Sequence, residues 1–556
     1  MGKKIYLYDT TLRDGTQGEN ISLSVEDKLR IAQRLDSFGI HYIEGGWPGS
    51  NPKDKRFFEL IKDKSFTFSK ITAFGSTRRW DCSIEDDPNI RALLSTGTDT
   101  ITIFGKSWDL HALKILDIGL DENCRIIQDT VGYFKSKGFE VIYDAEHFFD
   151  GFKHNPRYAI KTIRCAIEAG ADWIVLCDTN GGTLPHEIRD IMKEVVPLID
   201  RPVGIHAHDD CGLAVANSLM AIQCGATMVQ GTINGYGERC GNADLISLIG
   251  ILQLKMDYEC LPQENLSMLT EVSRFVSEVA NVPPNNQSPF VGKSAFAHKG
   301  GVHVSAILKD PSAYEHIDPE LVGNRRRVLV SDLSGKGNIE YKSTEMGIRL
   351  GGNGYDSRRI VQEIKRLEDQ GYQFEAAEAS LELLIKKITG QFEEPFTLKS
   401  FRVSIEKNGK GPSISHATIK ISVGKEEEIT AAEGDGPVNA LDNALRKALT
   451  KFFPEIEEMR LVDFKVRVID GDRGTAAKVR VQIESRDGSD IWSTVGVSKN
   501  IIEASWEALE DSVQFKLLKR DKMEGSAADS LSSGTLRRVL NDNLRDQTLF
   551  SNHIKE

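Results

Sequence analysis

The chain has 556 residues, of which 40% are hydrophobic and 27% are charged, and its formal net charge at pH 7 is −12. This composition is typical of a folded globular protein and excludes an intrinsically disordered one. The acidic balance argues against a general nucleic-acid-binding protein, although a local cluster of donors can still bind an anionic small molecule. Because the length exceeds what a single hydrophobic core supports, we expect two or more domains.

The beginning of the chain, MGKKIYLYD, has no apolar signal segment, and no later stretch reaches the roughly 18 apolar residues of a membrane span. All eight cysteines lie between Cys82 and Cys260, and none forms a CxxC pair. This spacing favours reduced thiols over a disulfide framework. We therefore expect a cytoplasmic protein.

Eight short runs of β-forming residues follow one another in the first 260 residues, and a segment with helical spacing comes after each run. The predicted strands are Ile5–Tyr8, His41–Glu44, Ile71–Phe74, Thr100–Ile103, Glu140–Tyr143, Trp173–Leu176, Pro202–Ile205 and Met228–Gly231. In the first helical segment, Ser24 can cap the amino end and Gly39 can stop the carboxyl end. Eight strand–helix units predict an α/β fold, a (β/α)8 TIM barrel over residues 1–265, with a doubly wound sheet as the alternative.

The pattern changes after the barrel, where residues 266–395 are expected to form helical linker subdomains. Helices are predicted near Glu264–Val279, Ser357–Asp369 and Ala376–Ile388. Residues 396–520 contain an internal repeat, in which the segment from Leu398 matches the segment from Leu461. Each copy ends with a glycine and a helix, so we expect two βββα units in a C-terminal α+β domain, followed by a polar tail over residues 521–556.

A pair of histidines, His206 and His208, stands at the exit of the seventh predicted strand. Side chains two apart on a strand point to the same face, so both imidazoles can converge on one ion. The alternative is a pair of hydrogen-bonded core histidines. Asp14 and Asn242 follow the first and eighth strands, at the same edge of the barrel. These four residues predict a site for one divalent ion, with Zn²⁺, Mn²⁺, Co²⁺ and Mg²⁺ all admissible.

Other polar residues also follow strands at this edge, where TIM barrels carry their sites. They are Arg13, Glu44, Asp144, Glu146, Thr179 and Glu238. Arg13 can stabilise an oxyanion or form a salt bridge across the barrel mouth. Glu44, Glu146 and Glu238 can take part in catalysis directly or can support neighbouring residues. Thr179 can donate a hydrogen bond to a substrate carboxylate or cap a helix.

The segments DTTLRDGTQG, HAHDDCGLA and GTINGYGERCGNADL resemble the signatures of the DRE-TIM metallolyases, in particular the α-isopropylmalate, homocitrate and citramalate synthases. The later segments SAFAHKGGVH, LVGNRRRVLVSDLSGKGN, EGDGPVNALDNAL and TVGVSKNIIEASWEAL resemble the linker subdomains and the regulatory domain of the same family. The resemblance extends from about residue 5 to residue 520. The last helix is most similar to that of the citramalate branch.

The resemblance implies an acyltransferase that condenses acetyl-CoA with a small 2-oxo acid, with pyruvate as the expected acceptor and isoleucine biosynthesis as its setting. The alternatives are condensation with 2-oxoisovalerate for leucine biosynthesis, a homocitrate synthase, a carbon–carbon lyase of the hydroxymethylglutaryl-CoA type and a non-catalytic amino-acid sensor. The C-terminal repeat domain argues against the lyase. The complete set of candidate metal ligands with Arg13 argues against the sensor.

The same resemblance implies roles for individual residues. The metal ligands are Asp14, His206, His208 and Asn242, and the residues at the substrate are Arg13, Glu44, Asp144, Glu146 and Thr179. His303 removes or relays a methyl proton of acetyl-CoA, and Tyr314 is its partner tyrosine, supplied from the neighbouring subunit. Asp209, where many members have asparagine, and the stretch from Tyr143 to Asp150 depart from the family pattern.

The resemblance also implies a homodimer whose repeat domain binds a branched-chain amino acid, with isoleucine as the expected inhibitor. Gly434, Gly436 and Gly496 come before helix starts, whose free N–H groups can bind a carboxylate. Alternatively, these glycines serve turn geometry alone.

Overall fold

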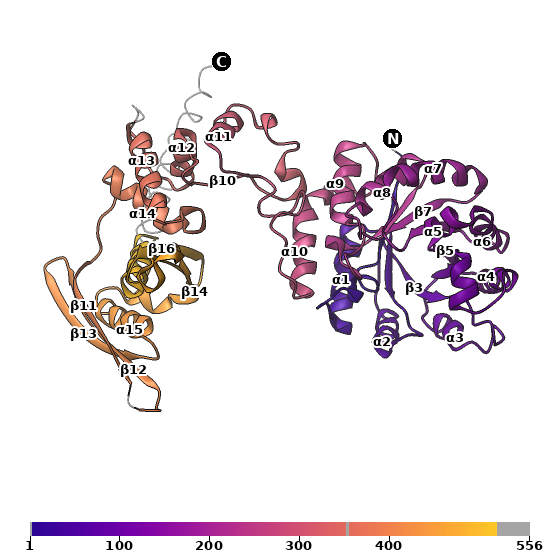
Figure 1. Cartoon of the computed structure of the whole chain (residues 1–556), viewed down its shortest axis with the longest axis horizontal. Coiled ribbons are helices and arrows are strands. Elements are labelled where there is room, and N and C mark those ends of the chain that lie inside the picture. Colours follow the sequence, from indigo (N-terminus) through magenta and orange to yellow (C-terminus); the bar gives the residue numbers. More distant parts are fainter. Residues whose placement is uncertain (1–2, 352–354, 408, 520–556) are drawn as a thin grey trace, which may run out of the picture. The chain divides into compact units, whose positions relative to one another are not determined.

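A computed structural model describes residues 3–351, 355–407 and 409–519. The polar tail that we expected over residues 521–556 lies outside the described residues. The chain divides into two compact units, Met1–Ala297 with Glu315–Arg327 and His298–Tyr314 with Val328–Glu556 (Figure 1). The chain passes from one unit to the other three times: within the short strand β9 (Ala297–His298), between Tyr314 and Glu315, and within the short strand β10 (Arg327–Val328).

The first unit is built around a closed barrel of eight parallel strands in chain order (Figure 1). The strands are β1 (Tyr6–Asp9), β2 (Tyr42–Gly46), β3 (Lys70–Ser76), β4 (Thr100–Lys106), β5 (Glu140–Glu146), β6 (Trp173–Asp178), β7 (Val203–Ala207) and β8 (Met228–Gly231). β1 pairs with β8, from Tyr6 opposite Met228 to Asp9 opposite Gly231, and this pairing closes the barrel. The TIM-barrel prediction is therefore confirmed, and the doubly wound sheet, which leaves two free edges, is wrong.

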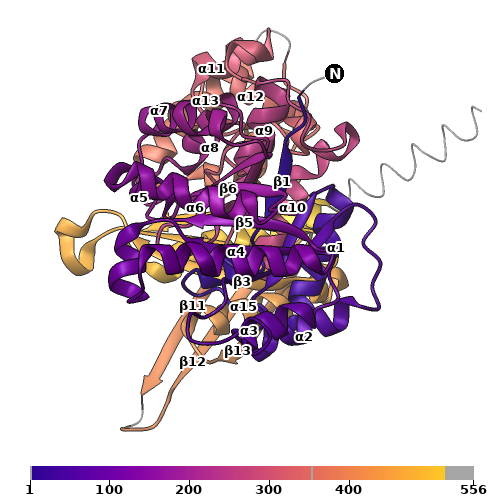
Figure 2. The same ribbon diagram turned by 90° about the vertical axis from the view of Figure 1, so that its right-hand side faces the viewer.

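Helices lie around the outside of these strands (Figure 2). They are α1 (Val25–Phe38), α2 (Pro52–Ile61), α3 (Pro88–Leu94), α4 (Leu120–Ser136), α5 (Phe148–His154), α6 (Pro156–Glu168), α7 (Pro185–Val195), α8 (Ala214–Gln223), α9 (Leu245–Lys255) and α10 (Leu269–Val279). In α1 the side chain of Ser24 accepts from the backbone of Asp27 in a capping box, and Gly39 ends the helix in the left-handed region with φ 102°. Helix α1 therefore begins and ends at the residues from which its ends were predicted.

The main hydrophobic core lies between the strands and the helices, with Ile31, Leu35 and Phe38 of α1 among its fully buried members. The helix predicted from Glu264 begins as a 3₁₀ turn (Gln263–Met268) and continues as α10. Within the part of the chain that the structure describes, no helix is long and apolar enough to cross a membrane. All eight cysteines are free thiols.

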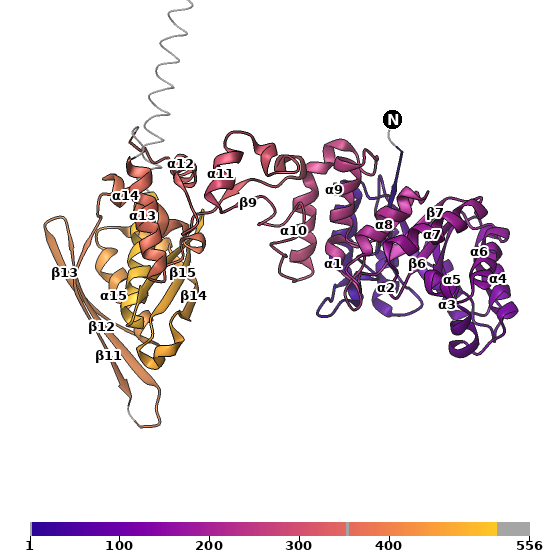
Figure 3. The same ribbon diagram turned by 45° about the horizontal axis from the view of Figure 1, so that its top comes forward.

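The second unit combines helices with two three-stranded antiparallel sheets (Figure 3). Its helices before the sheets are α11 (Gly301–Ile307), α12 (Lys336–Glu345), α13 (Tyr355–Asp369) and α14 (Glu378–Thr389). The first sheet with its helix comprises β11 (Thr397–Lys407), β12 (Ser413–Val423), β13 (Glu426–Gly434) and α15 (Pro437–Leu449). The second comprises β14 (Arg460–Val468), β15 (Val479–Arg486), β16 (Ile491–Ser498) and a helix over residues 501–519.

The two βββα units correspond to the repeat found in the sequence. The first strand of each sheet carries an irregularity at the same repeat position, between Leu398 and Ser400 in β11 and between Leu461 and Asp463 in β14. Sequence similarity therefore extends to the details of strand pairing, and the α+β prediction is confirmed.

Candidate metal centre and active site

Asp14, His206 and His208 lie together at the carboxyl edge of the barrel, and all three are buried. The Nε2 atoms of the two histidines are 3.3 Å apart. Oδ2 of Asp14 lies 3.3 Å from Nε2 of His206 and 3.9 Å from Nε2 of His208. His206 belongs to β7 and His208 follows it at once, so the two side chains share one face as strand alternation predicts.

Asn242, which follows β8, reaches the same cluster. Its Nδ2 atom lies 2.9 Å from Oδ2 of Asp14 and 3.2 Å from Nε2 of His206. Its Oδ1 atom is buried and has no hydrogen-bond partner among the described residues. Turning the amide by 180° exchanges the two atoms and brings a carbonyl oxygen to the carboxylate and the imidazole. Two imidazole nitrogens, a carboxylate and an amide oxygen then meet, and this donor set fits a divalent cation.

The charges around this cluster suit metal binding. Burial alone raises the pKa of Asp14, but Arg13 and His206 outweigh it and hold the pKa well below its usual range, so the carboxylate is ionised. Burial and the neighbouring His206 lower the pKa of His208 to about 3, which keeps this imidazole neutral. An ionised carboxylate and a neutral imidazole are the forms that bind metals.

A hydrogen-bonded chain orients His206 from behind. Oε1 of Gln230 lies 2.9 Å from Nδ1 of His206, and Nε2 of Gln230 donates to Oδ1 of Asp144 over 3.0 Å. Burial raises the pKa of Asp144 to about 7. Gln230 was not predicted from the sequence. The available signal was a polar residue inside the buried strand β8.

Arg13 is held at the mouth of the barrel by three partners. Its Nε atom donates to Oε1 of Glu44 over 2.5 Å, and its NH1 atom lies 3.4 Å from Oδ2 of Asp14. The guanidinium carbon stands 3.8 Å from the centre of the Phe74 ring. Glu44 is fixed in turn by Tyr8, whose hydroxyl donates to Oε2 over 2.5 Å. The salt bridge that we considered for Arg13 thus exists, and it also aims the guanidinium toward the metal cluster.

A cavity of about 200 Å³ lies in front of these groups. Its lining includes, besides the residues above, Gln17, Trp47, Phe74, Phe104, Glu146, Cys177, Thr179, Glu238 and Arg239. Trp47, Phe74 and Phe104 pack together as an aromatic wall, with ring centroids 5.2–5.9 Å apart. None of the three was predicted from the sequence, because an aromatic residue near the end of a strand has the same pattern as a core residue.

The structure brings most of the remaining predicted residues to this cavity. Glu146 forms an ion pair with Lys106, and Thr179 accepts from the backbone N–H of His147 over 2.9 Å. Arg239 donates to Asp210 and, over 2.8 Å, to the backbone oxygen of Thr179.

His303 and Tyr314 belong to the second unit. Their rings stack with centroids 4.2 Å apart, so they form a pair within one chain. Their catalytic roles, and the supply of Tyr314 from a neighbouring subunit, stay predictions.

The three glycines proposed for regulation differ from one another. A Cβ at Gly434 would lie 2.4 Å from the backbone nitrogen of Ala440, and a Cβ at Gly496 would lie 2.1 Å from the backbone oxygen of Ala504. Both glycines therefore let a helix pack directly on a strand. Gly436 caps α15 and has open space around it.

Comparison with known proteins identifies the class. Residues 4–276 match the family described as HMGL-like, residues 290–372 match the homocitrate synthase post-HMGL domain-like family, and residues 375–517 match the LeuA allosteric (dimerisation) domain.

Individual relatives narrow this class. The chain is 55% identical to an (R)-citramalate synthase of Aquifex aeolicus, over 94% of this chain and 100% of the relative. It is also 55% identical to an (R)-citramalate synthase of Geobacter sulfurreducens, over 94% of this chain and 99% of the relative. A 2-isopropylmalate synthase of Methanocaldococcus jannaschii is 31% identical, over 93% of this chain and 96% of the relative. The chain therefore belongs to the HMGL-like family of (R)-citramalate and 2-isopropylmalate synthases.

Proposed function

We propose that this protein condenses acetyl-CoA with pyruvate to form (R)-citramalate and CoA, in isoleucine biosynthesis, with the help of one divalent metal ion. The observation that carries the proposal is the 55% identity, over nearly the whole chain, to two (R)-citramalate synthases. The alternative acceptor is 2-oxoisovalerate, the substrate class of the more distant 2-isopropylmalate synthase relatives.

In this proposal Asp14, His206, His208 and Asn242 hold the metal ion. When bound, a divalent ion supplies Lewis acidity that polarises the keto group of the 2-oxo acid. Arg13 places a fixed positive charge at the same mouth, where it stabilises the negative charge that develops on the keto oxygen. Thr179 binds the substrate carboxylate through its hydroxyl, and Glu146 also lines the cavity.

The reaction needs a base for the weakly acidic methyl group of the thioester. We assign this role to His303, with Tyr314 stacked on it. Removal of the methyl proton gives an enolate, whose carbon forms a bond with the keto carbon of pyruvate while the keto oxygen takes up a proton. Water then hydrolyses the thioester, which releases CoA and leaves the second carboxylate group on the product.

The aromatic wall of the cavity favours pyruvate over larger 2-oxo acids as the acceptor. Trp47, Phe74 and Phe104 fill one side of a cavity of only about 200 Å³. The isopropyl group of 2-oxoisovalerate adds two carbons to the methyl group of pyruvate, and a hydrophobic pocket discriminates by about 1–3 kcal/mol per carbon.

One assay tests the proposal directly. The purified protein is given acetyl-CoA with Mg²⁺ or Mn²⁺ and, separately, pyruvate, 2-oxobutyrate, 2-oxoisovalerate or 2-oxoglutarate, and free thiol is measured. We expect the highest kcat/KM with pyruvate and loss of activity after chelation. A higher kcat/KM with 2-oxoisovalerate would establish the alternative, and absence of thiol release with every acid would disprove the synthase proposal.

The C-terminal domain supports a regulated dimer, since residues 375–517 match an allosteric (dimerisation) domain. We propose a homodimer that isoleucine inhibits, and the cytoplasmic location stays a prediction. Isothermal titration with isoleucine and leucine separates the two candidate inhibitors, and absence of heat with isoleucine would contradict this assignment.

A further inference from the structure

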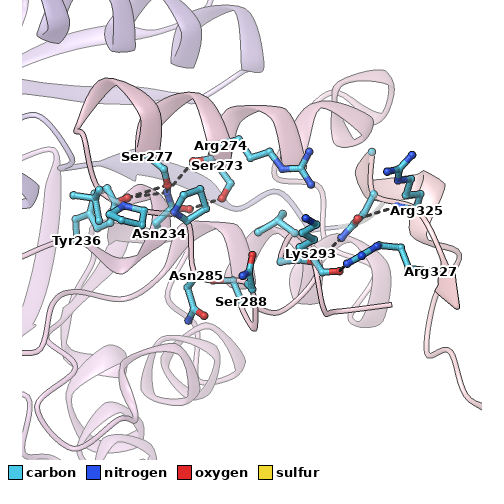
Figure 4. Close-up of a pocket in the computed structure, with 18 residues that line it drawn as sticks. Asn234, Tyr236, Ser273, Arg274, Ser277, Asn285, Ser288, Lys293, Arg325 and Arg327 are labelled. Carbon is cyan, nitrogen blue, oxygen red and sulfur yellow. Dashed lines mark hydrogen bonds between the residues drawn. The ribbon is translucent and has the colours of Figure 1, made fainter. Parts of the chain in front are cut away.

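A second cavity, of about 580 Å³, lies in the first unit and belongs to no site described so far (Figure 4). Its walls are α10, the segment from Val282 to Lys293, the segment from Gly323 to Arg327, and Asn234 with Tyr236 from the loop after β8. The volume falls within the range of about 300–1,000 Å³ that small-molecule sites occupy. We call it the cationic cavity because of the side chains that line it.

The charge of the cationic cavity has a single sign. Of the 18 described residues that line it, Arg274, Lys293, Arg325 and Arg327 are basic and none is acidic. The whole chain, by contrast, has 82 acidic and 70 basic residues. Four cations around one concavity repel one another, and a bound anion relieves this repulsion.

Three of these cations are not engaged elsewhere. Within the described residues, no carboxylate forms an ion pair with Arg274, Lys293 or Arg325. Arg327 donates to the backbone oxygen of Lys293 over 3.3 Å, which fixes one cationic segment against the other. Figure 4 shows Lys293, Arg325 and Arg327 gathered at one end and uncharged polar residues at the other.

The walls of the cationic cavity are held in place by buried hydrogen bonds. The buried amide of Asn324 donates to the backbone oxygens of Phe290 and Gly292 over 2.9 and 3.1 Å, and so ties the two loop segments together. At the other end, Asn234 exchanges hydrogen bonds with Ser273 and donates to Ser277 over 3.0 Å. Such a frame keeps the pocket formed without a ligand.

The cationic cavity also adjoins the metal centre through one stretch of chain. Tyr236, which lines the cavity, packs so closely on the loop after Asp14 that a Cβ at Gly15 would lie 3.6 Å from its own Cβ. The next residue, Gly237, packs against Asn242, since a Cβ there would lie 1.9 Å from Oδ1 of the asparagine. The loop after β8 is therefore a wall of both sites.

We propose that the cationic cavity binds the phosphorylated adenosine end of the acyl-CoA co-substrate. The inference rests on the proposed function, because that reaction brings an acyl-CoA to the barrel mouth. Acyl-CoA carries a 3′-phosphate and a diphosphate, and lysine and arginine side chains bind phosphate groups by charge-assisted hydrogen bonds. The long uncharged pantetheine arm separates these phosphates from the reacting thioester, so a second site beside the metal centre is what such a substrate requires.

The test removes two cations and compares two thioesters. The variant Lys293→Ala/Arg325→Ala is assayed with acetyl-CoA and with S-acetylpantetheine, which has the same acyl group without the adenosine phosphates. We expect KM for acetyl-CoA to rise about tenfold or more, since one hydrogen bond to a charged group contributes roughly 1.5–3 kcal/mol. The kcat/KM for S-acetylpantetheine should change less than about twofold.

A control variant carries the same loss of charge elsewhere. Arg91→Ala/Lys193→Ala removes two exposed cations from α3 and α7, and we expect no change with either thioester. Lys293→Arg, which keeps the charge, should retain most of the affinity for acetyl-CoA. An equal loss with both thioesters, or no change with either, would overturn the inference.

Inhibition experiments distinguish the phosphates of acyl-CoA from a free phosphate-containing effector. Adenosine 3′,5′-bisphosphate should compete with acetyl-CoA in the unmodified protein, and the double variant should lose this inhibition. If ATP or inorganic phosphate changes activity through these cations while KM for acetyl-CoA stays the same, the cavity binds a free effector and the inference is wrong. Failure of the proposed function is separate, because it appears as absence of thiol release by the unmodified protein.

Discussion

Gln230 fixes the tautomer of His206. Its Oε1 atom can only accept, and it lies 2.9 Å from Nδ1 of the imidazole, so this nitrogen carries the proton. The orientation of the amide is set by Asp144, which accepts from Nε2 of Gln230 over 3.0 Å. Burial alone lowers the pKa of His206, but Asp14 beside Nε2 outweighs burial and raises this pKa. Once the ring is neutral, the lone pair of Nε2 becomes free for a metal ion at this cluster.

We therefore expect Gln230→Leu to weaken metal binding by about 10- to 100-fold, since outer hydrogen-bond partners contribute about this much to metal affinity. Titration of the metal-free protein with Mn²⁺ measures the change. Gln33→Leu on the exposed side of α1 is the control. Unchanged affinity in Gln230→Leu would show that β7 alone orients the histidine.

Replacing Arg13 by lysine should lower kcat more than it raises KM for pyruvate. Lysine keeps the charge but cannot donate to Glu44 while it faces Asp14, as the guanidinium does. Loss of one oxyanion-stabilising donor costs about 10²–10³ in kcat. Steady-state kinetics of this variant, with the exposed Arg157→Lys as control, provide the measurement. A rise in KM alone would assign Arg13 to binding only.

The aromatic wall should set the size of the acceptor. Phe104→Ala removes one of three packed rings and enlarges the cavity of about 200 Å³. We expect the ratio of kcat/KM for 2-oxobutyrate to that for pyruvate to rise by roughly tenfold, the effect of about one added carbon. Competition between the two acids in one reaction gives this ratio directly. The buried Phe134→Leu in α4, which does not line the cavity, should leave it unchanged.

The buried His41 should lower the free energy of unfolding of the protein in weakly acidic solution. Burial and the nearby Lys4 lower its pKa to about 4, and in its neutral form Nδ1 accepts from the backbone N–H of Leu7 over 3.2 Å. Because the folded pKa lies below the unfolded value, this stability is fully present above about pH 6.5 and is lost as pH falls toward 4. The loss between pH 8 and pH 5 is roughly 2 kcal/mol for this one group.

Urea unfolding at several pH values measures this loss as the free energy of unfolding. His41→Gln should flatten the pH dependence, whereas the exposed His186→Gln should leave it as it is. An equally steep dependence in both variants would mean that other groups cause it.

Replacement by alanine should destabilise the protein at one glycine of the C-terminal domain and have little effect at another. Gly496→Ala brings a Cβ to within 2.1 Å of the backbone oxygen of Ala504, and overpacking of this kind costs about 1–3 kcal/mol. Gly436→Ala meets nothing within 4 Å and its backbone is extended, so the melting temperature should hardly change. Thermal unfolding of both variants tests this, and equal melting temperatures would contradict the packing role of Gly496.

The residues of the candidate metal centre could largely be predicted from the sequence. His206 and His208 are two apart on a strand, and Asp14 and Asn242 follow strands one and eight, which pair with each other only if the barrel closes. The supporting residues did not follow in the same way. Gln230 and Phe104 resemble ordinary strand residues, and their roles depend on which side of the barrel wall they face.

The eight strand–helix units, the C-terminal repeat and the residue types at the candidate metal centre can be predicted from the sequence alone, because periodicity, caps and spacing are local properties of the chain. The position of Gln230 behind His206, and the four cations from three separate segments that line one cavity, depend on the tertiary fold. His206 and Gln230 are 24 positions apart, and the cations that line the cavity are spread over three segments of the chain, so these contacts are fixed by packing and not by local preference.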